Sequence, residues 1–222
     1  MPIMSARAVG AGLCTFLMAS AALAGPVVPF TETFDNGVAG YTSSFGTPLT
    51  FNGVLLFRGT IPTGGFGAST VLAANFANNP SGGAFIGNYL TNPNAPLTFS
   101  FDVRVIAAPV PLTFSLRVVQ APGNFPAVVL TQPGTLDLGN GFTRVSFLIS
   151  PTAPGLVPEG PPSPAFINGV LSNVGSIQIL VNDSAANGTL VGFNFDNISI
   201  VPAPGAAGLL GLAGLLAARR RR

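Results

Sequence analysis

Residues 97–105 read LTFSFDVRV, and this stretch decides the fold. Its odd positions are apolar and its even positions are polar, without exception. A period of two is typical of a β-strand that buries one face and leaves the other in water. The alternation returns at residues 112–118, after a connection that contains two prolines. We therefore predict two adjacent antiparallel strands at these positions.

The rest of the chain between its two ends is also predicted to form strands. Further candidates are residues 30–34, 48–57, 70–76, 84–90, 143–149, 176–181 and 190–200. Asn-Gly pairs, which favour turns with positive φ, begin at Asn36, Asn52, Asn140, Asn168 and Asn187. No segment shows the period of an amphipathic helix, and the proline-rich residues 151–164 are predicted to be a surface loop. The prediction is one all-β domain, an antiparallel two-sheet sandwich.

The last candidate strand contains a change of phase. Its apolar positions run in step as far as Phe195 and then resume one residue out of step at Ile198. A phase change within a strand indicates a β-bulge, here predicted at Asp196 and Asn197.

The N-terminal residues 1–24 have the pattern of a secretory signal peptide. Arg7 precedes an apolar stretch, and Ala22-Leu23-Ala24 forms an A-x-A cleavage site before Gly25. We therefore expect the protein to be exported.

The C-terminal residues 201–222 form a second targeting segment. Pro202 and Pro204 interrupt regular structure, and an apolar run follows at residues 205–218. As a helix this run would rise about 21 Å, against about 30 Å for a hydrocarbon core. A short span remains feasible because long basic side chains at its end can reach the headgroups. The run ends in Arg219, Arg220, Arg221 and Arg222, which are predicted to stay on the cytoplasmic side.

This order of motifs resembles the PEP-CTERM sorting signal of Gram-negative bacteria. The resemblance covers Val201, Pro202, Pro204, the apolar run and the arginines, with Ala203 where the family usually has Glu. It implies transient anchoring in the inner membrane and processing by an exosortase-type membrane transpeptidase. The expected destination is the cell surface or an extracellular matrix, with exopolysaccharide or biofilm material as a partner. An ordinary tail anchor and a basic amphipathic tail on the membrane surface are the alternatives.

The composition of the body, residues 25–200, excludes several functions. It has four arginines and seven carboxylates, a net charge of −3, which does not favour a nucleic-acid partner. The chain has no histidine and no lysine, and its single cysteine, Cys14, lies in the signal peptide. Serine–histidine and cysteine–histidine nucleophiles, histidine-bound zinc and lysine Schiff bases are therefore excluded. Only paired-carboxylate chemistry remains, and we predict that the protein is not an enzyme.

The two ends of the body resemble jelly-roll domains of the carbohydrate-binding-module type. The motifs are TETFDNG at residues 31–37 and FNFDNISI at residues 193–200. In that family the first and last strands often lie together and share a structural calcium, which implies Glu32, Asp35 and Asp196 as tentative ligands. The alternative for Asp196 is a hydrogen bond to local backbone at the predicted bulge.

Sugar binding has a weak signal in the sequence. Sugar rings usually stack on exposed tryptophan or tyrosine, but the chain has no tryptophan and only two tyrosines, Tyr41 and Tyr89. Tyr41 is predicted to be a core residue. The leading hypothesis is thus an exported, non-enzymatic surface or matrix protein that is processed at its C-terminal signal. A calcium-stabilised carbohydrate-binding module is the alternative.

Overall fold

The computed structural model describes residues 25–43, 46–61, 69–72, 80–91, 96–139, 141–182 and 188–203 of the 222-residue chain. Of residues 69–72 it describes the backbone only. The signal peptide and the tail after Ala203 lie outside these residues, so both remain predictions. In the part of the chain that is described, no helix is long and apolar enough to cross a membrane.

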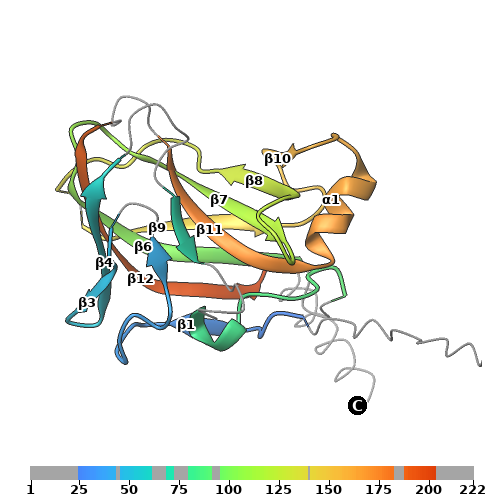
Figure 1. Cartoon of the computed structure of the whole chain (residues 1–222), viewed down its shortest axis with the longest axis horizontal. Coiled ribbons are helices and arrows are strands. Elements are labelled where there is room, and N and C mark those ends of the chain that lie inside the picture. Colours follow the sequence, from blue (N-terminus) through green and yellow to red (C-terminus); the bar gives the residue numbers. More distant parts are fainter. Residues whose placement is uncertain are drawn as a thin grey trace, which may run out of the picture.

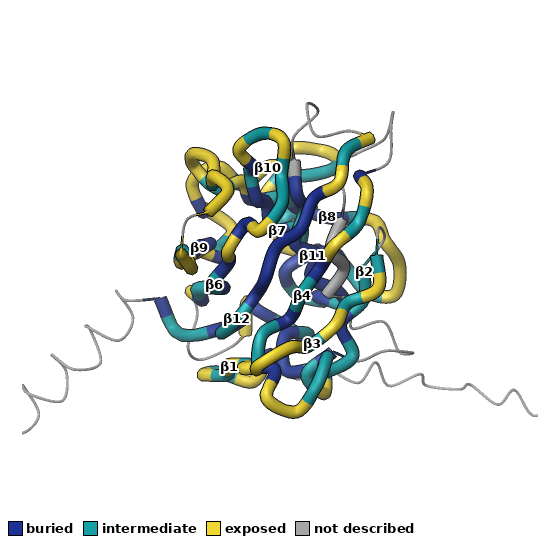
Figure 2. The backbone as a smooth tube through the Cα atoms, turned by 90° about the vertical axis from the view of Figure 1, so that its left-hand side faces the viewer, coloured by how far each residue is buried: buried dark blue, intermediate teal, exposed yellow. Residues whose placement is uncertain are grey.

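Two antiparallel sheets pack face to face in a jelly-roll sandwich (Figure 1). The first sheet has the order β3 (Leu49–Phe51), β4 (Val54–Thr60), β12 (Leu190–Pro202), β6 (Leu97–Ala107) and β9 (Thr143–Ile149), and β1 (Phe30–Glu32) also pairs with β12. The second sheet has the order β10 (Leu156–Glu159), β8 (Ala127–Thr131), β7 (Thr113–Gln120), β11 (Val174–Asn182), β5 (Ser69–Leu72) and β2 (Thr42–Ser43). Figure 2 shows the two sheets side by side, and long stretches of their strands, such as β12, are buried. The predicted all-β, two-sheet fold is confirmed.

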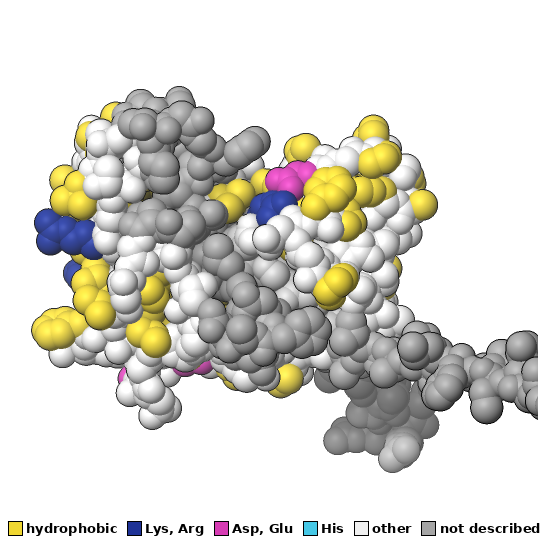
Figure 3. All heavy atoms as spheres, viewed as in Figure 1, with side chains coloured by type: hydrophobic (Ala, Val, Ile, Leu, Met, Phe, Trp, Pro, Cys, Tyr) yellow, Lys and Arg dark blue, Asp and Glu magenta, His cyan; other side chains and the backbone are white. Residues whose placement is uncertain are grey.

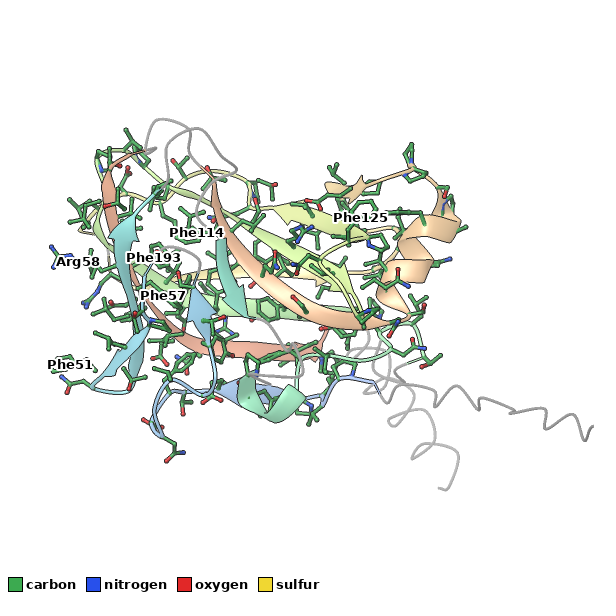
Figure 4. All side chains as sticks on the ribbon, in the orientation of Figure 1. Phe51, Phe57, Arg58, Phe114, Phe125 and Phe193 are labelled. Atoms are coloured by element: carbon green, nitrogen blue, oxygen red, sulfur yellow. The ribbon has the colours of Figure 1, made fainter. Side chains whose placement is uncertain are left out.

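A cluster of phenylalanine rings fills the space between the sheets. Phe114 on β7 lies with its ring centroid 5.7 Å from Phe193 and 6.1 Å from both Phe101 and Phe195 of the first sheet. Each of these pairs is edge-to-face, a geometry worth about 0.5–1.5 kcal/mol beyond the buried area. Figure 4 labels Phe57, Phe114 and Phe193 in this interior.

β12 carries the predicted β-bulge. Its register against β6 shifts between Asp196 and Ser199, and Asn197 has a φ of +49°. Arg144 on β9 reaches over this point, where Nη1 donates to the Asn197 carbonyl at 3.1 Å and Nη2 donates to Ser199 Oγ at 2.6 Å. The same guanidinium forms an ion pair with Asp102 at 3.1 Å. One arginine therefore holds three strands together at the bulge.

The predicted pairing of residues 97–105 with residues 112–118 is wrong. β6 pairs with β12 and β9, whereas β7 pairs with β8 and β11 of the opposite sheet. Pro109 and Pro111 lie in the connection, and each lacks the N–H that a tight hairpin would use. The chain crosses between sheets here, and alternation alone does not indicate which sheet a strand joins.

Other expected strands also differ in detail. Residues 48–57 form the hairpin β3–β4, in which Asn52 and Gly53 have φ values of +49° and +74°. Residues 84–90 contain only an isolated bridge between Gly87 and Val174. β8 was not predicted, because its apolar run does not alternate.

The proline-rich residues 151–164 are not a simple loop. They contain β10, an edge strand in which Pro158 is tolerated because an edge strand leaves half of its donors unused. They then lead into α1 (Pro164–Leu171), which Ser163 caps by accepting a hydrogen bond from the Phe166 N–H at 3.2 Å. α1 packs on β7 and β8 and includes the Asn168–Gly169 pair that was predicted to be a turn. A helix of eight residues is too short to show its period clearly.

The two described ends of the body lie side by side. Phe30 on β1 pairs with Ile200 on β12. β12 continues two residues beyond the expected boundary, to Pro202 opposite Leu97, and the Ala203 N–H donates to the Pro96 carbonyl at 2.9 Å. The proline motif thus begins inside the last strand.

We predict that Phe195→Ala lowers the free energy of unfolding by about 3–5 kcal/mol, because it opens a cavity between the sheets. Phe51→Ala is the matched control, since Phe51 is 69% exposed and Phe195 is fully buried. Urea denaturation followed by fluorescence or circular dichroism would measure both. Equal losses for the two variants would contradict the proposed core.

Candidate functional site

Arg117 lies at the centre of the outer face of the second sheet. On β7 the side chains of Phe114, Leu116 and Val118 are buried in the core, so Arg117 points to the opposite side. Its backbone neighbours are Val129 on β8 and Gln178 on β11. An arginine in the middle of a sheet therefore faces out between two flanking strands.

The guanidinium of Arg117 is held by four hydrogen bonds. Nε and Nη2 donate to Glu159 Oε2 on β10 at 2.9 and 2.6 Å, and Nη1 donates to Gln178 Oε1 at 2.9 Å. Nη2 also donates to the Asn124 carbonyl at 2.7 Å. The arginine side chain is only 15% exposed, so these charge-assisted bonds are shielded from solvent. One side chain thus connects β10, β11 and the β7–β8 loop.

Phe125 follows Asn124 directly and is presented to solvent. Its side chain is 63% exposed, and its ring centroid lies 6.4 Å from that of Phe166 on α1. Figure 4 places Phe125 near β8 and α1, away from the core phenylalanines. The bond from Arg117 to the Asn124 carbonyl fixes the loop beside this ring. Arg117 therefore acts as a positioning residue for an exposed aromatic side chain.

Polar and apolar groups meet on this face. Glu159 Oε1 has no hydrogen-bond partner among the described residues, and Ser176 Oγ on β11 is buried and likewise unpartnered. Val157 lies two positions before Glu159 on β10, and its side chain is 60% exposed. Figure 3 shows one basic and one acidic group side by side, bordered by hydrophobic side chains. A fixed polar row beside an aromatic ring can orient a ligand with hydroxyls and an apolar face.

Glu32 is engaged in a different network from the one implied for calcium. Its Oε2 accepts from Ser81 Oγ at 2.9 Å, and its Oε1 accepts from the Phe34 N–H at 3.1 Å. Ser81 Oγ in turn lies 3.1 Å from the hydroxyl of Tyr41, whose pKa is raised by burial. Glu32 thus fastens β1 to the short η1 segment (Pro80–Gly83), and Tyr41 is a core residue as predicted.

Asp35 and Asp196 are not joined by Glu32 into a metal-binding group. Within the described ranges, no cluster of three or more Asp, Glu, His or Cys side chains could hold a metal ion. Asp35 Oδ2 accepts from Thr33 Oγ1 at 2.7 Å. Asp196 Oδ1 accepts from the Asn197 N–H at 2.7 Å, the local bond that the sequence offered as the alternative to calcium.

The residues of the two predicted targeting signals fall partly within the described chain. Val201 pairs with Thr98 at the end of β12, and Ala203 is buried. Gly25 begins the described body. Ala22, Ala24, Pro204 and the four arginines at positions 219–222 lie outside the described residues.

One pocket of about 330 Å³ opens where β6 begins and β9 ends. It carries no charged side chain, and the hydroxyl of Tyr89 is already bonded to the Phe85 carbonyl. Burial raises the pKa of Tyr89. The lining is Tyr89, Leu90, Pro96, Ile149, Ser150, Pro151 and Leu171. Without free polar groups, this pocket is a weaker candidate than the face around Arg117.

The sequence analysis missed the residues of this face. The alternation at residues 112–118 predicts an outward side chain at Arg117 but no partner for it, and residues 151–164, which include Glu159, are predicted to be a surface loop. The available signal was Phe125, an aromatic residue in the glycine- and proline-rich run APGNFP, where no strand pattern buries it.

Comparison with known proteins gives similarities of structure only. No family model and no curated protein sequence matches the chain. The structure is similar to the family 11 carbohydrate-binding module of a cellulosomal cellulase from Clostridium thermocellum, with 17% identity, a TM-score of 0.47, and coverage of 81% of this chain and 97% of that one. It is also similar to a xylan-binding domain from Paenibacillus barcinonensis, with 12% identity, a TM-score of 0.43, and coverage of 80% and 96%. An agarase matches with 10% identity and a TM-score of 0.43, over 74% of this chain and 23% of the agarase. At these identities the similarity assigns no function.

We predict that Asp196→Asn stabilises the protein at neutral pH. Burial raises the pKa of Asp196 above its ordinary value of 3.8, the Asn197 N–H lowers it, and the charges of Asp102 and Asp35 raise it. A raised pKa in the folded state means that stability falls as the pH rises from 3.8 through the folded value. Asparagine keeps the acceptor for Asn197 but removes the charge. Urea unfolding should therefore show a gain near pH 7 and none near pH 3.

The same variant tests the calcium hypothesis. If Asp196 were a calcium ligand, Asp196→Asn would lower the melting temperature in calcium relative to the value of the same variant's shift with a chelator. We expect the same increase in melting temperature under both conditions.

Proposed function

We propose that this protein is an exported, non-catalytic protein that binds a neutral polysaccharide through the face around Arg117. The observation that carries the proposal is the arrangement of Phe125, an exposed ring fixed next to the polar row of Arg117, Gln178 and Glu159. Sugar rings offer an apolar face of C–H groups and a rim of hydroxyls, and they need both kinds of contact. A binding site combines aromatic area with a few fixed polar groups that set orientation.

The charge of this face favours a neutral ligand. Arg117 and Glu159 form an ion pair, so the two charges compensate each other. An anionic ligand would have to compete with Glu159 for the guanidinium, and the second oxygen of that carboxylate would repel it. Hydroxyl groups can instead donate to Glu159 Oε1 without disturbing the pair.

A binding role is better supported here than hydrolysis. Hydrolysis of a glycosidic bond requires two carboxyl groups on opposite sides of the bond, about 5–10 Å apart. On the described outer face of the second sheet only Glu159 carries a carboxylate, and its Oε2 accepts two bonds from Arg117. The complete absence of histidine and lysine from the chain is consistent with this proposal.

We further propose the route by which the protein reaches its site. The signal peptide would direct export, the tail would hold the precursor in the inner membrane, and an exosortase-type transpeptidase would release it near Val201–Pro204 to the cell surface or matrix. The adjacency of Phe30 and Ile200 supports a body attached to the membrane from one end, because both targeting segments leave from there.

Binding is tested with Phe125→Ala. Affinity electrophoresis in gels containing mixed-linkage β-glucan or xylan should show that the variant binds at least about tenfold more weakly than the parent, because the ring supplies the stacking surface. Phe51→Ala removes an equally exposed ring from the other sheet and should bind as the parent does. The melting temperature should not change in either variant. Retained binding in Phe125→Ala, or no binding to any neutral polysaccharide by the parent protein, would refute the proposal.

Processing is tested separately by intact mass after cell fractionation. In cells with the sorting enzyme we expect loss of residues 1–24 and of the tail from about position 201, together with release from the inner membrane. An uncut tail in cells with and without the enzyme would contradict the proposed sorting. It would indicate an ordinary tail-anchored protein.

A further inference from the structure

The outer face of the first sheet carries two arginines of its own. Arg58 on β4 pairs with Gly192 on β12, and Arg104 on β6 pairs with Asn194 on β12. Both side chains are exposed and belong to the outward-facing positions, since their strand neighbours Phe57 and Val105 are buried. The two arginines therefore flank β12 on the same face. Standard strand spacings put their Cα atoms about 12 Å apart.

These two arginines differ from the other two in the described body. Arg117 and Arg144 form ion pairs with Glu159 and Asp102. Among the described residues, Arg58 and Arg104 have no carboxylate within ion-pair distance. The body is acidic overall, so two neighbouring arginines without a carboxylate partner among the described residues create a local positive potential. Such a potential attracts an anionic ligand.

An aromatic ring accompanies the second arginine. The guanidinium carbon of Arg104 lies 5.2 Å from the centroid of Phe142, a side chain that is 43% exposed. Stacking on a ring holds the arginine plane in place and leaves its N–H groups free to bind an anion in a bidentate manner.

An unsatisfied acceptor lies between the two arginines. Asn194 is on the outward side of β12, between the core positions Phe193 and Phe195, and it is only 7% exposed. Its Oδ1 has no hydrogen-bond partner in the described structure. A buried carbonyl oxygen without a donor is unfavourable, and a ligand hydroxyl that reached this position would supply the missing donor.

Apolar side chains surround this group. Ile106, Leu190 and Leu49 are 38%, 46% and 58% exposed, and Phe51 extends the same hairpin edge. Figure 4 labels Arg58 and Phe51 at the same margin of the molecule, and Figure 3 shows basic side chains among hydrophobic ones there.

We propose that this face is a second binding site, for an acidic polysaccharide of the polyuronate type. The carboxylates of the polymer would bind Arg58 and Arg104, its hydroxyls would donate to Asn194 Oδ1, and its C–H faces would pack on Phe142 and Ile106. A polyuronate carries carboxylates, hydroxyls and C–H faces in one molecule. The site is separate from the face around Arg117, because it lies on the other sheet.

The position of the site favours a soluble polymer over a membrane surface. Gly192, opposite Arg58, lies ten positions before Pro202 on β12, which is about 33 Å along an extended strand. The tail leaves the body beyond Pro202, so the arginines are far from the anchored end. A lipid surface would also offer few hydroxyl donors to a carbonyl oxygen that is almost completely buried.

The test compares three polymers against the full-length chain in mild detergent: polygalacturonate, polyglutamate and neutral mixed-linkage β-glucan. The variant Arg58→Gln/Arg104→Gln should bind polygalacturonate at least about tenfold more weakly, because two charge-assisted contacts are lost. The control Ala165→Glu/Asn168→Asp makes the same change in net charge on exposed positions of α1 and should bind as the parent does. Binding to β-glucan should be unaffected by the arginine changes, and Phe125→Ala should leave polygalacturonate binding intact.

Three outcomes would overturn the inference. These are no binding of polygalacturonate by the parent, an equal loss in the α1 control, and equally tight binding of polyglutamate. The second would indicate a net-charge effect, and the third would indicate recognition of an acidic polypeptide without any need for hydroxyls. None of them bears on binding at the Arg117 face, which the β-glucan measurement tests independently.

Discussion

The packing of Phe114 against the rings of the first sheet is the interaction on which the rest of the structure depends. It is a residue of the second sheet whose ring contacts Phe101, Phe193 and Phe195 of the first. The described chain contains no disulfide-forming residue, because Cys14 is the only cysteine. Aromatic packing between the sheets must therefore supply the stabilisation that a disulfide bond supplies in some other domains.

With the interior fixed, each outer face is organised by an arginine that joins strands far apart in sequence. Arg144 spans β9, β6 and β12 and closes the bulge at Asn197. Arg117 spans β7, β10 and β11 and holds the loop before Phe125. Both guanidinium groups are used for positioning. Arg58 and Arg104 have no ion-pair partner among the described residues, and they are the arginines that the proposed second site uses.

The candidate sites could be predicted only in part, and the limit has a physical cause. The phase change in the last strand identified the bulge, because a one-residue slip moves side chains to the opposite face and is visible in the order of residues. Glu159 and Arg117 are 42 positions apart, and their contact depends on the order of strands in the sheet. The contact of Glu32 with Ser81, 49 positions away, depends on the tertiary structure in the same way, and calcium binding by Glu32, Asp35 and Asp196 stays a prediction.

By itself the sequence determined the period of the strands whose residues alternate, the all-β class, the turn at Asn52–Gly53 and the burial of Tyr41. These properties depend on neighbours within a few residues along the chain. Only the tertiary structure decided which sheet each strand joins, so that β6 and β7 lie in opposite sheets. It also decided that Arg117 and Arg144 form ion pairs with carboxylates and that Arg58 and Arg104, in the part of the chain that is described, do not. The order of strands in a sheet depends on how all side chains of the interior pack together. Alternation shows only which side chains of a strand are buried, so it does not indicate the neighbours of that strand.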